Sequence, residues 1–411
     1  MDYSQKTQID RSARKICGAL IMKIGYVLSA FPKLSESFIL NEIVELLKRG
    51  HEVNIFSLRR SQDVFHNEVE EYELLKRTYF LPEQRKYINK LLFRFSSIGT
   101  FGWKYPSENL KSKALSIAAA KYYFKIAKKL DLDIIQAHFN RIAAHTAMLL
   151  GQSLRVPYTF TGHAVDIFVE PNVIALKTRM ENTKAVITPS YYNREYLHTL
   201  TDVDKNKINV VRACLDIEKF KRIKRNPDNF RILTVCRLVE KKGLKYSILA
   251  IKEILHEFPE ISYRIVGSGP LENELKKLVN QLGLEENMQF LGDITDDSLI
   301  YELSKATIFV LPCIKAKNGD MDVCPLTLQE AMIAKIPVVS TVMASIPELI
   351  ENKKEGLLVE SKNVKQLVEA IKNLLEHKNL REMLGENGRE KIENKFNISY
   401  EVKKLLEIWS T

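Results

Sequence analysis

Short apolar segments alternate with amphipathic segments along most of the chain. Residues 23–29 (KIGYVLS) are apolar and rich in β-forming residues, and residues 51–58 form a second such run after Gly50. The segment between them carries on one helical face Phe38, Ile39, Ile43, Leu46 and Leu47. Ser35 is a suitable N-cap for this helix, because its hydroxyl can accept a hydrogen bond from a first-turn N–H. The pattern predicts a βαβ unit, and open parallel sheets bind ligands where their strands end.

The alternation continues, is interrupted once and then restarts. Further strand-like runs lie at 131–140, 155–168, 185–190 and 208–220. The polar stretch 219–230, which contains Pro227, follows them, and beyond it apolar runs and helices recur. A chain of 411 residues also exceeds what one hydrophobic core usually serves. We therefore expect an α/β protein with parallel sheets in two domains, at 22–222 and 223–390, a candidate N-terminal extension at 1–21 and a final helix at 391–411.

The stretch from Pro312 to Glu348 contains the most informative pattern. An apolar run ends at Leu311, a loop with Asp320 and Asp322 follows, and a helix is expected to begin near Pro325 with Glu330 on its second turn. Proline suits the first position of a helix, and the free N–H groups of a helix start favour an anion. This arrangement could hold the phosphates and hydroxyls of a nucleotide-sugar.

Two other segments could complete such a site. Arg237 lies just past the strand ILTVC, and Lys242 precedes the next helix, so both cations could stabilise a departing diphosphate. The loop Gly267, Ser268 and Gly269 follows the strand YRIV, where glycines allow a ligand to approach the backbone. Each cation, taken alone, would be an ordinary surface residue.

A histidine in the first domain lies where a ligand site is expected. His163 follows a strand and Gly162, and Asp166 comes three residues later. A lone histidine is more often part of the structure than of the chemistry, so both interpretations remain open for His163.

Three Asp-X-Asp strings raise the question of a metal ion. They are Asp131-Asp133, Asp202-Asp204 and Asp320-Asp322, and the third alone follows a predicted strand. Because Arg237 and Lys242 could serve the diphosphate, we expect no metal and no cofactor.

The basic excess lies entirely in the first half of the chain. Residues 1–222 contain 35 Lys and Arg against 23 Asp and Glu, whereas residues 223–411 contain 27 against 28. Residues 76–94 and 111–130 interleave basic residues with aromatic and aliphatic ones, as in helices that bind anionic bilayers. A solvated helix face would give the same pattern. The first domain is therefore a candidate for contact with an anionic membrane, and no nucleic-acid module is found.

Other features limit the location and the chemistry. The five cysteines are scattered, no apolar run approaches the ~20 residues of a membrane span, and the first residues lack the features of a secretory signal. We expect a cytoplasmic protein, with peripheral binding at the inner face of the membrane as an option. The chain has no GxSxG, Walker or GxGxxG motif, so hydrolase, P-loop and hydride-transfer activities lack support.

These motifs together resemble the retaining family 4 (group 1) glycosyltransferases, in particular the exopolysaccharide or colanic-acid-type members. The matching motifs run in order from about Met22 to the end: FPKLSESFILNEI, CRLVEKKG, VGSGPLENEL, the Pro312–Glu348 stretch and IPVVST…IPELI…GLLV. The resemblance implies the GT-B fold, in which two Rossmann-like domains face each other across a cleft. It also implies that the last helix crosses back to the first domain.

The resemblance also assigns roles to residues. Asp322-x7-Glu330 takes the place of the family's E-x7-E motif, with Glu330 on the ribose and Asp322 on the donor sugar. Arg237 and Lys242 are similar to the diphosphate-binding pair, and His163 to a histidine near the donor sugar, with Asp166 on the acceptor side. The remaining donor-binding positions implied are Ser35, Glu36, Gly267, Ser268, Gly269, Cys324, Leu326 and Thr327. The sequence departs from the family pattern at Asp322, which is shorter than Glu, and at Cys324, where glycine is frequent.

The resemblance implies transfer of a sugar, with retention, from a UDP-, GDP- or ADP-sugar to a hydroxyl of a saccharide or lipid-linked saccharide, in the biosynthesis of a surface polysaccharide. Two alternatives stay open at this point. A nucleotide-sugar epimerase could use the same fold without an acceptor, and a non-catalytic member could bind a nucleotide-sugar only.

Overall fold

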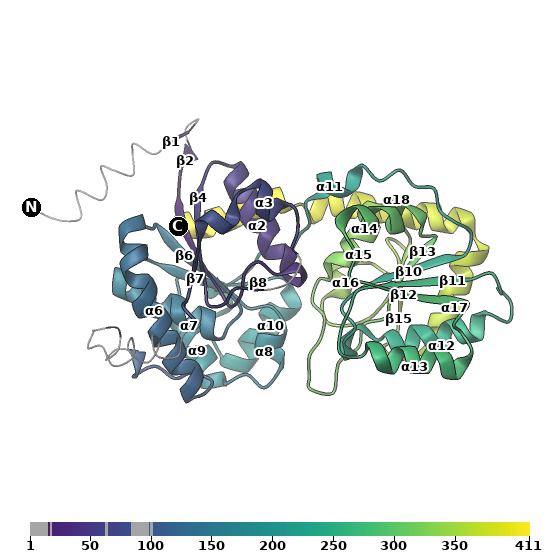
Figure 1. Cartoon of the computed structure of the whole chain (residues 1–411), viewed down its shortest axis with the longest axis horizontal. Helices are drawn as coiled ribbons and strands as arrows, with labels where there is room; N and C mark the ends of the chain where they lie inside the picture. Colours follow the sequence, from purple (N-terminus) through teal and green to yellow (C-terminus); the bar gives the residue numbers. More distant parts are fainter. Residues whose placement is uncertain (1–14, 17–18, 62–64, 84–97, 99–101) are drawn as a thin grey trace, which may run out of the picture.

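Two parallel sheets, each covered by helices, form two lobes that lie side by side (Figure 1). The computed structural model describes residues 15–16, 19–61, 65–83, 98 and 102–411. A short antiparallel pair, β1 (Lys15–Ile16) with β2 (Ala19–Leu20), precedes the first sheet.

The first sheet has seven strands in the order β5-β4-β3-β6-β7-β8-β9, all parallel. Its strands are β3 (Lys23–Leu28), β4 (Glu52–Ser57), β5 (Thr78–Phe80), β6 (Ile134–His138), β7 (Tyr158–Thr161), β8 (Ala185–Thr188) and β9 (Ile208–Val210). Its helices are α2 (Ser37–Lys48), α3 (Glu68–Glu71), α6 (Leu110–Leu130), α7 (Ile142–Leu154), α8 (Val165–Phe168), α9 (Val173–Asn182), α10 (Tyr191–Thr201) and α11 (Ile217–Lys221), with 3-10 turns η1 (Leu34–Glu36), η2 (Leu74–Arg77) and η3 (Lys205–Lys207).

The second sheet has six parallel strands in the order β12-β11-β10-β13-β14-β15. Its strands are β10 (Arg231–Val235), β11 (Ser262–Val266), β12 (Met288–Gly292), β13 (Ile308–Leu311), β14 (Val338–Thr341) and β15 (Leu357–Val359). Its helices are η4 (Glu240–Lys242), α12 (Leu244–Ile254), α13 (Glu272–Leu282), α14 (Asp296–Lys305), α15 (Leu326–Ile333), α16 (Ile346–Leu349), α17 (Val364–Glu376) and α18 (Lys378–Lys395). The chain passes from one sheet to the other between Val210 and Arg231. The expectation of two parallel-sheet α/β domains is confirmed.

The side chains of β3 alternate between the two apolar clusters that form the core. Ile24, Tyr26 and Leu28 are buried in one apolar cluster, whereas Val27 belongs to the other. Successive side chains of a strand point to opposite faces, so the two faces of this sheet pack into different clusters. The second of these clusters contains the residues buried under α6 and α7, and the first continues into the second lobe.

The predicted cap of the first helix is wrong by one residue. Ser35 lies inside η1 and is exposed, while α2 begins at Ser37 with Glu36 at its N-cap position. The 3-10 turn adds residues between Pro32 and the helix, so the hydroxyl that sequence spacing selects cannot cap it. The buried face of α2 is formed by Ile39, Leu40, Ile43, Val44 and Leu46, close to the predicted face.

The two basic segments differ from each other in structure. Residues 111–130 form a helix as expected, within α6. Residues 76–80 do not form the predicted amphipathic helix. Lys76 and Arg77 end the short turn η2, and Thr78–Phe80 is an edge strand that pairs with β4. The rest of that segment, from residue 84 to residue 94, lies outside the described residues. None of the described helices is both long enough and apolar enough to cross a bilayer.

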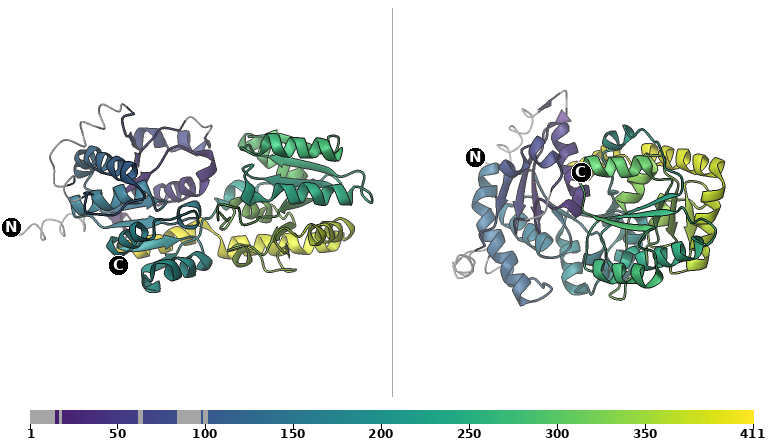
Figure 2. Two further views of the ribbon diagram at one scale, coloured as in Figure 1. Left: turned by 90° about the horizontal axis from the view of Figure 1, so that it is seen from below. Right: turned by 45° about the vertical axis from the view of Figure 1, so that its right-hand side comes forward.

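The last helix, α19 (Ile398–Ser410), returns to the first lobe, as Figures 1 and 2 show. Trp409 is buried there, and its indole Nε1 donates to Thr159 Oγ1 at 2.9 Å. At the other end of the helix, Arg49 of α2 donates to the carbonyl of Ser399 at 2.6 Å. The helix break after Lys395 means that residues 391–395 still belong to α18, which packs against α15 of the second lobe. The predicted crossing is confirmed.

Candidate functional site

The helix predicted near Pro325 begins at Leu326, with Pro325 as its N-cap residue. No side chain caps its first turn within the described residues, and the buried Thr327 Oγ1 has no hydrogen-bond partner there. The N–H groups at a helix start need acceptors, and the helix dipole favours a negative one. The start of α15 can therefore bind an anionic group.

Glu330 lies one turn further along α15, and its carboxylate has no hydrogen-bond or ion-pair partner among the described residues. Burial raises the pKa of Glu330 to about 7, while the charges of His66 and Lys219 oppose that rise. A half-buried carboxylate without a partner is unfavourable on its own, and hydroxyl donors of a ligand would satisfy it.

Close to Glu330, four side chains from both lobes form an ion-pair cluster. Lys219 Nζ lies 2.6 Å from Asp296 Oδ2 and 3.2 Å from Glu68 Oε1, and His66 Nδ1 lies 3.3 Å from Asp296 Oδ1. The hydrogen bond from His66, together with Lys219, lowers the pKa of Asp296 to about 2. This cluster joins α3 and α11 to the start of α14 and was not anticipated from the sequence, because its members are spread over 230 positions.

His66, Glu68 and Asp296 are also the one group in the described part of the chain whose atoms are spaced to bind a metal ion. Lys219 Nζ already lies between both carboxylates, so the cluster contains an ammonium where a cation would bind. Asp320 and Asp322 are not part of such a group within the described residues.

The second site element is an ion pair between Lys242 and Asp322. Both side chains are largely buried, at 13% and 10% exposure. Burial alone would raise the pKa of Asp322, but Lys242 and Lys241 outweigh it and lower that pKa to about 2. Burial opposes the charge of Lys242 as well, yet Asp322 raises its pKa above the ordinary value. Both groups are therefore charged and paired with each other at neutral pH.

Lys241 joins Asp322 to the second acid of the loop. Its Nζ lies 3.4 Å from Asp322 Oδ1 and 3.1 Å from Asp320 Oδ2. Sequence reasoning singled out Lys242 and missed Lys241, although the paired lysines in KKG were the available signal.

Arg237 lies at the carboxyl end of β10 and is exposed, without a side-chain partner among the described residues. The glycine loop packs directly against it. Gly267 has φ +115°, and a Cβ there would lie 2.0 Å from the carbonyl oxygen of Cys236. Leu238 N donates to Ser268 O at 2.9 Å, which joins the two loops. The structure thus brings Arg237 and the Gly267–Gly269 loop together at one edge of the sheet.

Cys324 explains why glycine suits the position just before α15. Its φ is +50°, a left-handed conformation that costs a side chain energy and glycine very little. Contacts hold the conformation: Cys324 N donates to Ser345 Oγ at 3.1 Å, and Gln329 Nε2 donates to Ala213 O at 2.8 Å. These contacts join the start of α15 to the segment between the sheets. The four described cysteines are all free and buried.

His163 lies in an aromatic environment in the first lobe. Its ring centroid is 4.6 Å from that of Phe38 and 4.7 Å from that of Phe139. Its Nε2 lies 3.0 Å from Nδ1 of His138. Burial, with a smaller effect of His138, holds the pKa of His163 well below its ordinary value, so the ring is neutral.

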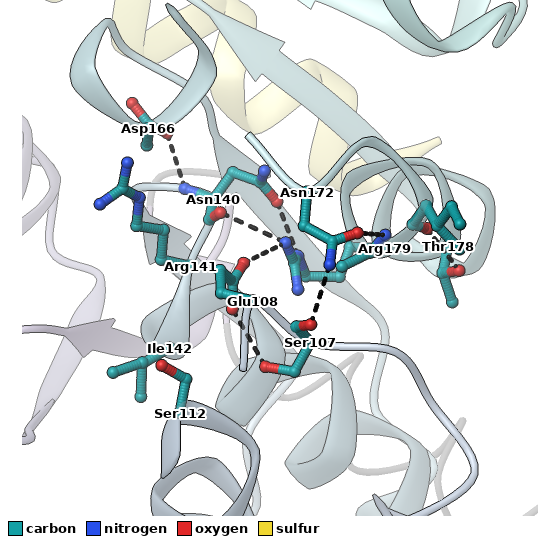
Figure 3. Close-up of polar contacts among 12 residues, drawn as sticks. Ser107, Glu108, Ser112, Asn140, Arg141, Ile142, Asp166, Asn172, Thr178 and Arg179 are labelled. Atoms are coloured by element: carbon teal, nitrogen blue, oxygen red, sulfur yellow. Dashed lines mark hydrogen bonds and ion pairs between the residues drawn. The ribbon is translucent and has the colours of Figure 1, made fainter. Parts of the chain in front are cut away.

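Asp166 is enclosed by backbone N–H groups. Its carboxylate is buried and accepts hydrogen bonds from three backbone N–H groups, those of Asn140, His163 and Ala164, at 2.7 to 3.1 Å. These bonds hold it inside the loop, where it positions the backbone at His163, and its assignment to the acceptor side stays a prediction. Figure 3 shows Asp166 bonded to Asn140, which in turn accepts a bond at 2.7 Å from the buried Arg179.

Ser35 and Glu36 lie in η1, close to the ion-pair cluster. His66 Nε2 lies 3.2 Å from the carbonyl oxygen of Leu34, and Glu36 pairs with Lys33 at 2.6 Å. His66 therefore links η1 to the ion-pair cluster close to Glu330. The carboxylate of Glu36 is already paired with Lys33.

Comparison with known proteins identifies the class. Residues 35–219 match the model described as Glycosyltransferase Family 4, and residues 216–391 match Glycosyl transferases group 1. The chain therefore belongs to the family 4 (group 1) glycosyltransferases, enzymes that transfer sugars, and it has the GT-B fold.

Individual relatives agree with this assignment. The chain is 29% identical over 424 residues to the putative colanic acid biosynthesis glycosyltransferase WcaL of Escherichia coli, covering 94% of this chain and 100% of WcaL. It is 28% identical to the amylovoran biosynthesis glycosyltransferase AmsK of Erwinia amylovora, covering 94% and 99%. Among solved structures, HepE of Anabaena, in complex with UDP and glucose, superposes with a TM-score of 0.74 at 18% identity, covering 95% and 100%. This structural likeness concerns the fold alone.

Proposed function

We propose that the protein transfers a sugar from a nucleoside-diphosphate sugar to a hydroxyl of a saccharide or lipid-linked saccharide, with retention, in the biosynthesis of a surface polysaccharide. The names of WcaL and AmsK support the polysaccharide assignment, since both relatives match along nearly their whole length. The observation that carries the proposal is the unpartnered carboxylate of Glu330, one turn inside a helix whose start is also uncapped within the described residues.

In this proposal each part of the site has one task. Glu330 accepts hydrogen bonds from the ribose, and the start of α15, with Thr327, receives phosphate oxygens. Arg237 supplies the cation nearest to solvent, and the Gly267–Gly269 loop lets the diphosphate approach the backbone. Catalysis then rests on holding donor and acceptor together and on stabilising the charge of the departing diphosphate.

The charge of Lys242 is already paired with that of Asp322. We propose that the diphosphate competes for this ammonium and that Asp322 is then free to accept a hydroxyl of the donor sugar. The same lysines support catalysis without a metal ion, since Lys241 and Lys242 already neutralise the acidic loop.

HepE, solved with UDP and with UDP-glucose, favours UDP-sugars as the first donors to examine. The experiment is a panel of UDP-, GDP- and ADP-sugars incubated with the purified chain and saccharide or lipid-linked acceptors. We expect one donor to yield a glycoside, in the presence of a chelator, whose anomeric configuration by NMR equals that of the donor. A new nucleotide-sugar epimer formed without acceptor, or an inverted product, would overturn the assignment.

We further propose that the first lobe contacts an anionic membrane. Exposed apolar side chains at Trp103, Leu110 and Ile174 lie near exposed Lys104 and Lys111, and Asn172 joins the two segments through a bond to Ser107 O at 3.1 Å. Apolar and basic side chains together suit such a surface. Flotation with anionic vesicles should weaken with added salt and with Leu110→Glu, whereas no binding at any salt concentration would contradict the proposal.

A further inference from the structure

Three buried or half-buried side chains lead away from His163 into the first lobe. His138, at the end of β6, lies 3.0 Å from His163 Nε2 through its Nδ1, and its Nε2 lies 3.2 Å from Oε1 of Glu42 in α2. Tyr26 of β3 donates its hydroxyl to the same carboxylate oxygen at 2.6 Å. The family resemblance places His163 near the donor sugar, but none of the tasks proposed above explains this chain of hydrogen bonds.

The geometry of the two rings supports a direct hydrogen bond. Their planes differ by 18°, and the centroid distance of 5.2 Å is about the 3.0 Å between the two nitrogens plus the distance from each ring centre to its nitrogen, so the rings meet edge to edge. A hydrogen bond between ring nitrogens needs this arrangement, because the lone pair lies in the ring plane. His138 itself is 1% exposed.

The order of donors and acceptors follows from Glu42. An ionised carboxylate only accepts hydrogen bonds, so His138 must carry its proton on Nε2. If His138 carries only that proton, its Nδ1 is an acceptor, and His163 donates to it from its own Nε2. A neutral imidazole has one N–H, which leaves Nδ1 of His163 as a bare acceptor.

That acceptor is available to a ligand. Nδ1 of His163 has no partner within the described residues, and it is not one of the unpartnered nitrogens that are fully sealed from solvent. Phe38 and Phe139 hold the ring, so its outward nitrogen keeps one direction.

We propose that Glu42 and His138 are positioning residues that fix the tautomer of His163, so that its Nδ1 accepts a hydrogen bond from a hydroxyl of the bound sugar. The inference rests on the proposed function for the identity of the ligand. The tautomer itself follows from the hydrogen bonds of His138 and is independent of the reaction. Partners that fix the tautomer of a metal-bound histidine contribute about 10- to 100-fold to metal affinity or activity, and we expect an effect of the same order on His163.

The test begins with the tautomer, which a packing role alone would not determine. The full chain is labelled with ¹⁵N-histidine, and two-bond ¹H–¹⁵N correlation spectra are recorded, with His138→Phe and His163→Phe to assign the two rings. We expect both rings as the Nε2–H tautomer. An Nδ1–H tautomer of His163 in the wild-type chain would overturn the proposal, whether or not the protein transfers sugar.

Kinetics then test the consequence. His138→Phe keeps a ring but no nitrogen, and kcat/KM for the donor should fall about 10- to 100-fold. His138→Asn places an amide near the position of Nδ1 and should restore most of that loss. His145→Phe is the matched control, since His145 is equally buried in the same lobe and both its nitrogens lack partners within the described residues. Equal activity of the His138→Phe and His145→Phe variants would overturn the proposal, whereas absence of transfer by the wild-type chain would contradict the proposed function instead.

Discussion

Lys242 and Asp322, 80 positions apart in the chain, form a largely buried ion pair at the carboxyl edge of the second sheet. The pair joins η4 to the acidic loop before α15, and Lys241 extends it to Asp320 at 3.1 Å. The two residues to which the family resemblance assigned different parts of a donor thus contact each other.

Asp322→Asn should destabilise the chain. Removal of one partner leaves the Lys242 ammonium largely buried without its counter-charge, which typically costs about 3–5 kcal/mol, and Asp320 could offset a part. Urea denaturation followed by tryptophan fluorescence would measure the free energy of unfolding. Asp297→Asn, an exposed acid on α14, is the control and should change it little.

The ion pair between Lys242 and Asp322 also predicts that the stability of the chain depends on pH in the acid range. The pKa of Asp322 is lowered to about 2, so its contribution to stability is present above the ordinary pKa of an aspartate and is lost as pH falls through about 2. Denaturation between pH 6 and pH 2 should therefore show a steeper loss for the wild-type chain than for Asp322→Asn. Parallel curves for the two proteins would contradict the assignment.

Arg237→Ala should reduce turnover without disturbing the fold, because the side chain is exposed and unpartnered within the described residues. A charge-assisted hydrogen bond contributes about 1.5–3 kcal/mol, which corresponds to roughly 10- to 150-fold in rate. Steady-state kinetics with the donor found in the panel would measure it, and Arg222→Ala, an exposed arginine between the sheets, is the control. Turnover close to wild type would exclude Arg237 from the diphosphate site.

Glu330 should make donor binding depend on pH near neutrality. Its pKa is raised to about 7, and the ionised carboxylate is the stronger acceptor for ribose hydroxyls. Calorimetry should show donor affinity rising as pH increases through about 7. Glu330→Gln should bind weakly and without this dependence, and the same pH dependence in the variant would exclude Glu330 as its source.

The free protein gives an independent check on Glu330. A raised carboxyl pKa means that the native state binds more protons than the unfolded state, so stability falls as pH rises from the ordinary glutamate value toward 7. Glu330→Gln should remove that loss, and its melting temperature at pH 8 should exceed that of the wild-type chain. A lower melting temperature would indicate a structural partner for Glu330.

Glu348, in the second lobe, should slow hydrogen exchange at the start of α10 in the first lobe. Its carboxylate accepts from Tyr192 N at 2.9 Å and from Tyr191 N at 3.1 Å. Anionic groups stabilise helix starts by about 0.3–1 kcal/mol at exposed positions. Hydrogen exchange of the Tyr191 and Tyr192 amides should accelerate in Glu348→Ala and stay unchanged in Glu351→Ala, whose side chain pairs locally with Lys354.

Local sequence patterns were sufficient to predict most helices and strands and part of the candidate site. The strands at 23–29 and 308–311, the helix start at Pro325 and the return of the last helix all follow from apolar periodicity and helix-start chemistry, together with the family resemblance. Such signals depend on neighbours within a few positions, so they survive without tertiary context. Ser35 shows where this fails, because a 3-10 turn that the spacing does not encode moved the cap.

Pairing between distant side chains could not be predicted. The sequence by itself determined which residues follow the strands: Arg237, Lys242, His163, Asp322 and Glu330. Only the tertiary structure decided that Lys242 neutralises Asp322, that Asp166 is enclosed by backbone N–H groups, and that Glu42 and His138 lie behind His163. The reason is physical: the charge and proton state of each group depend on its burial and on partners brought together by the parallel sheets, and neither is a property of local sequence.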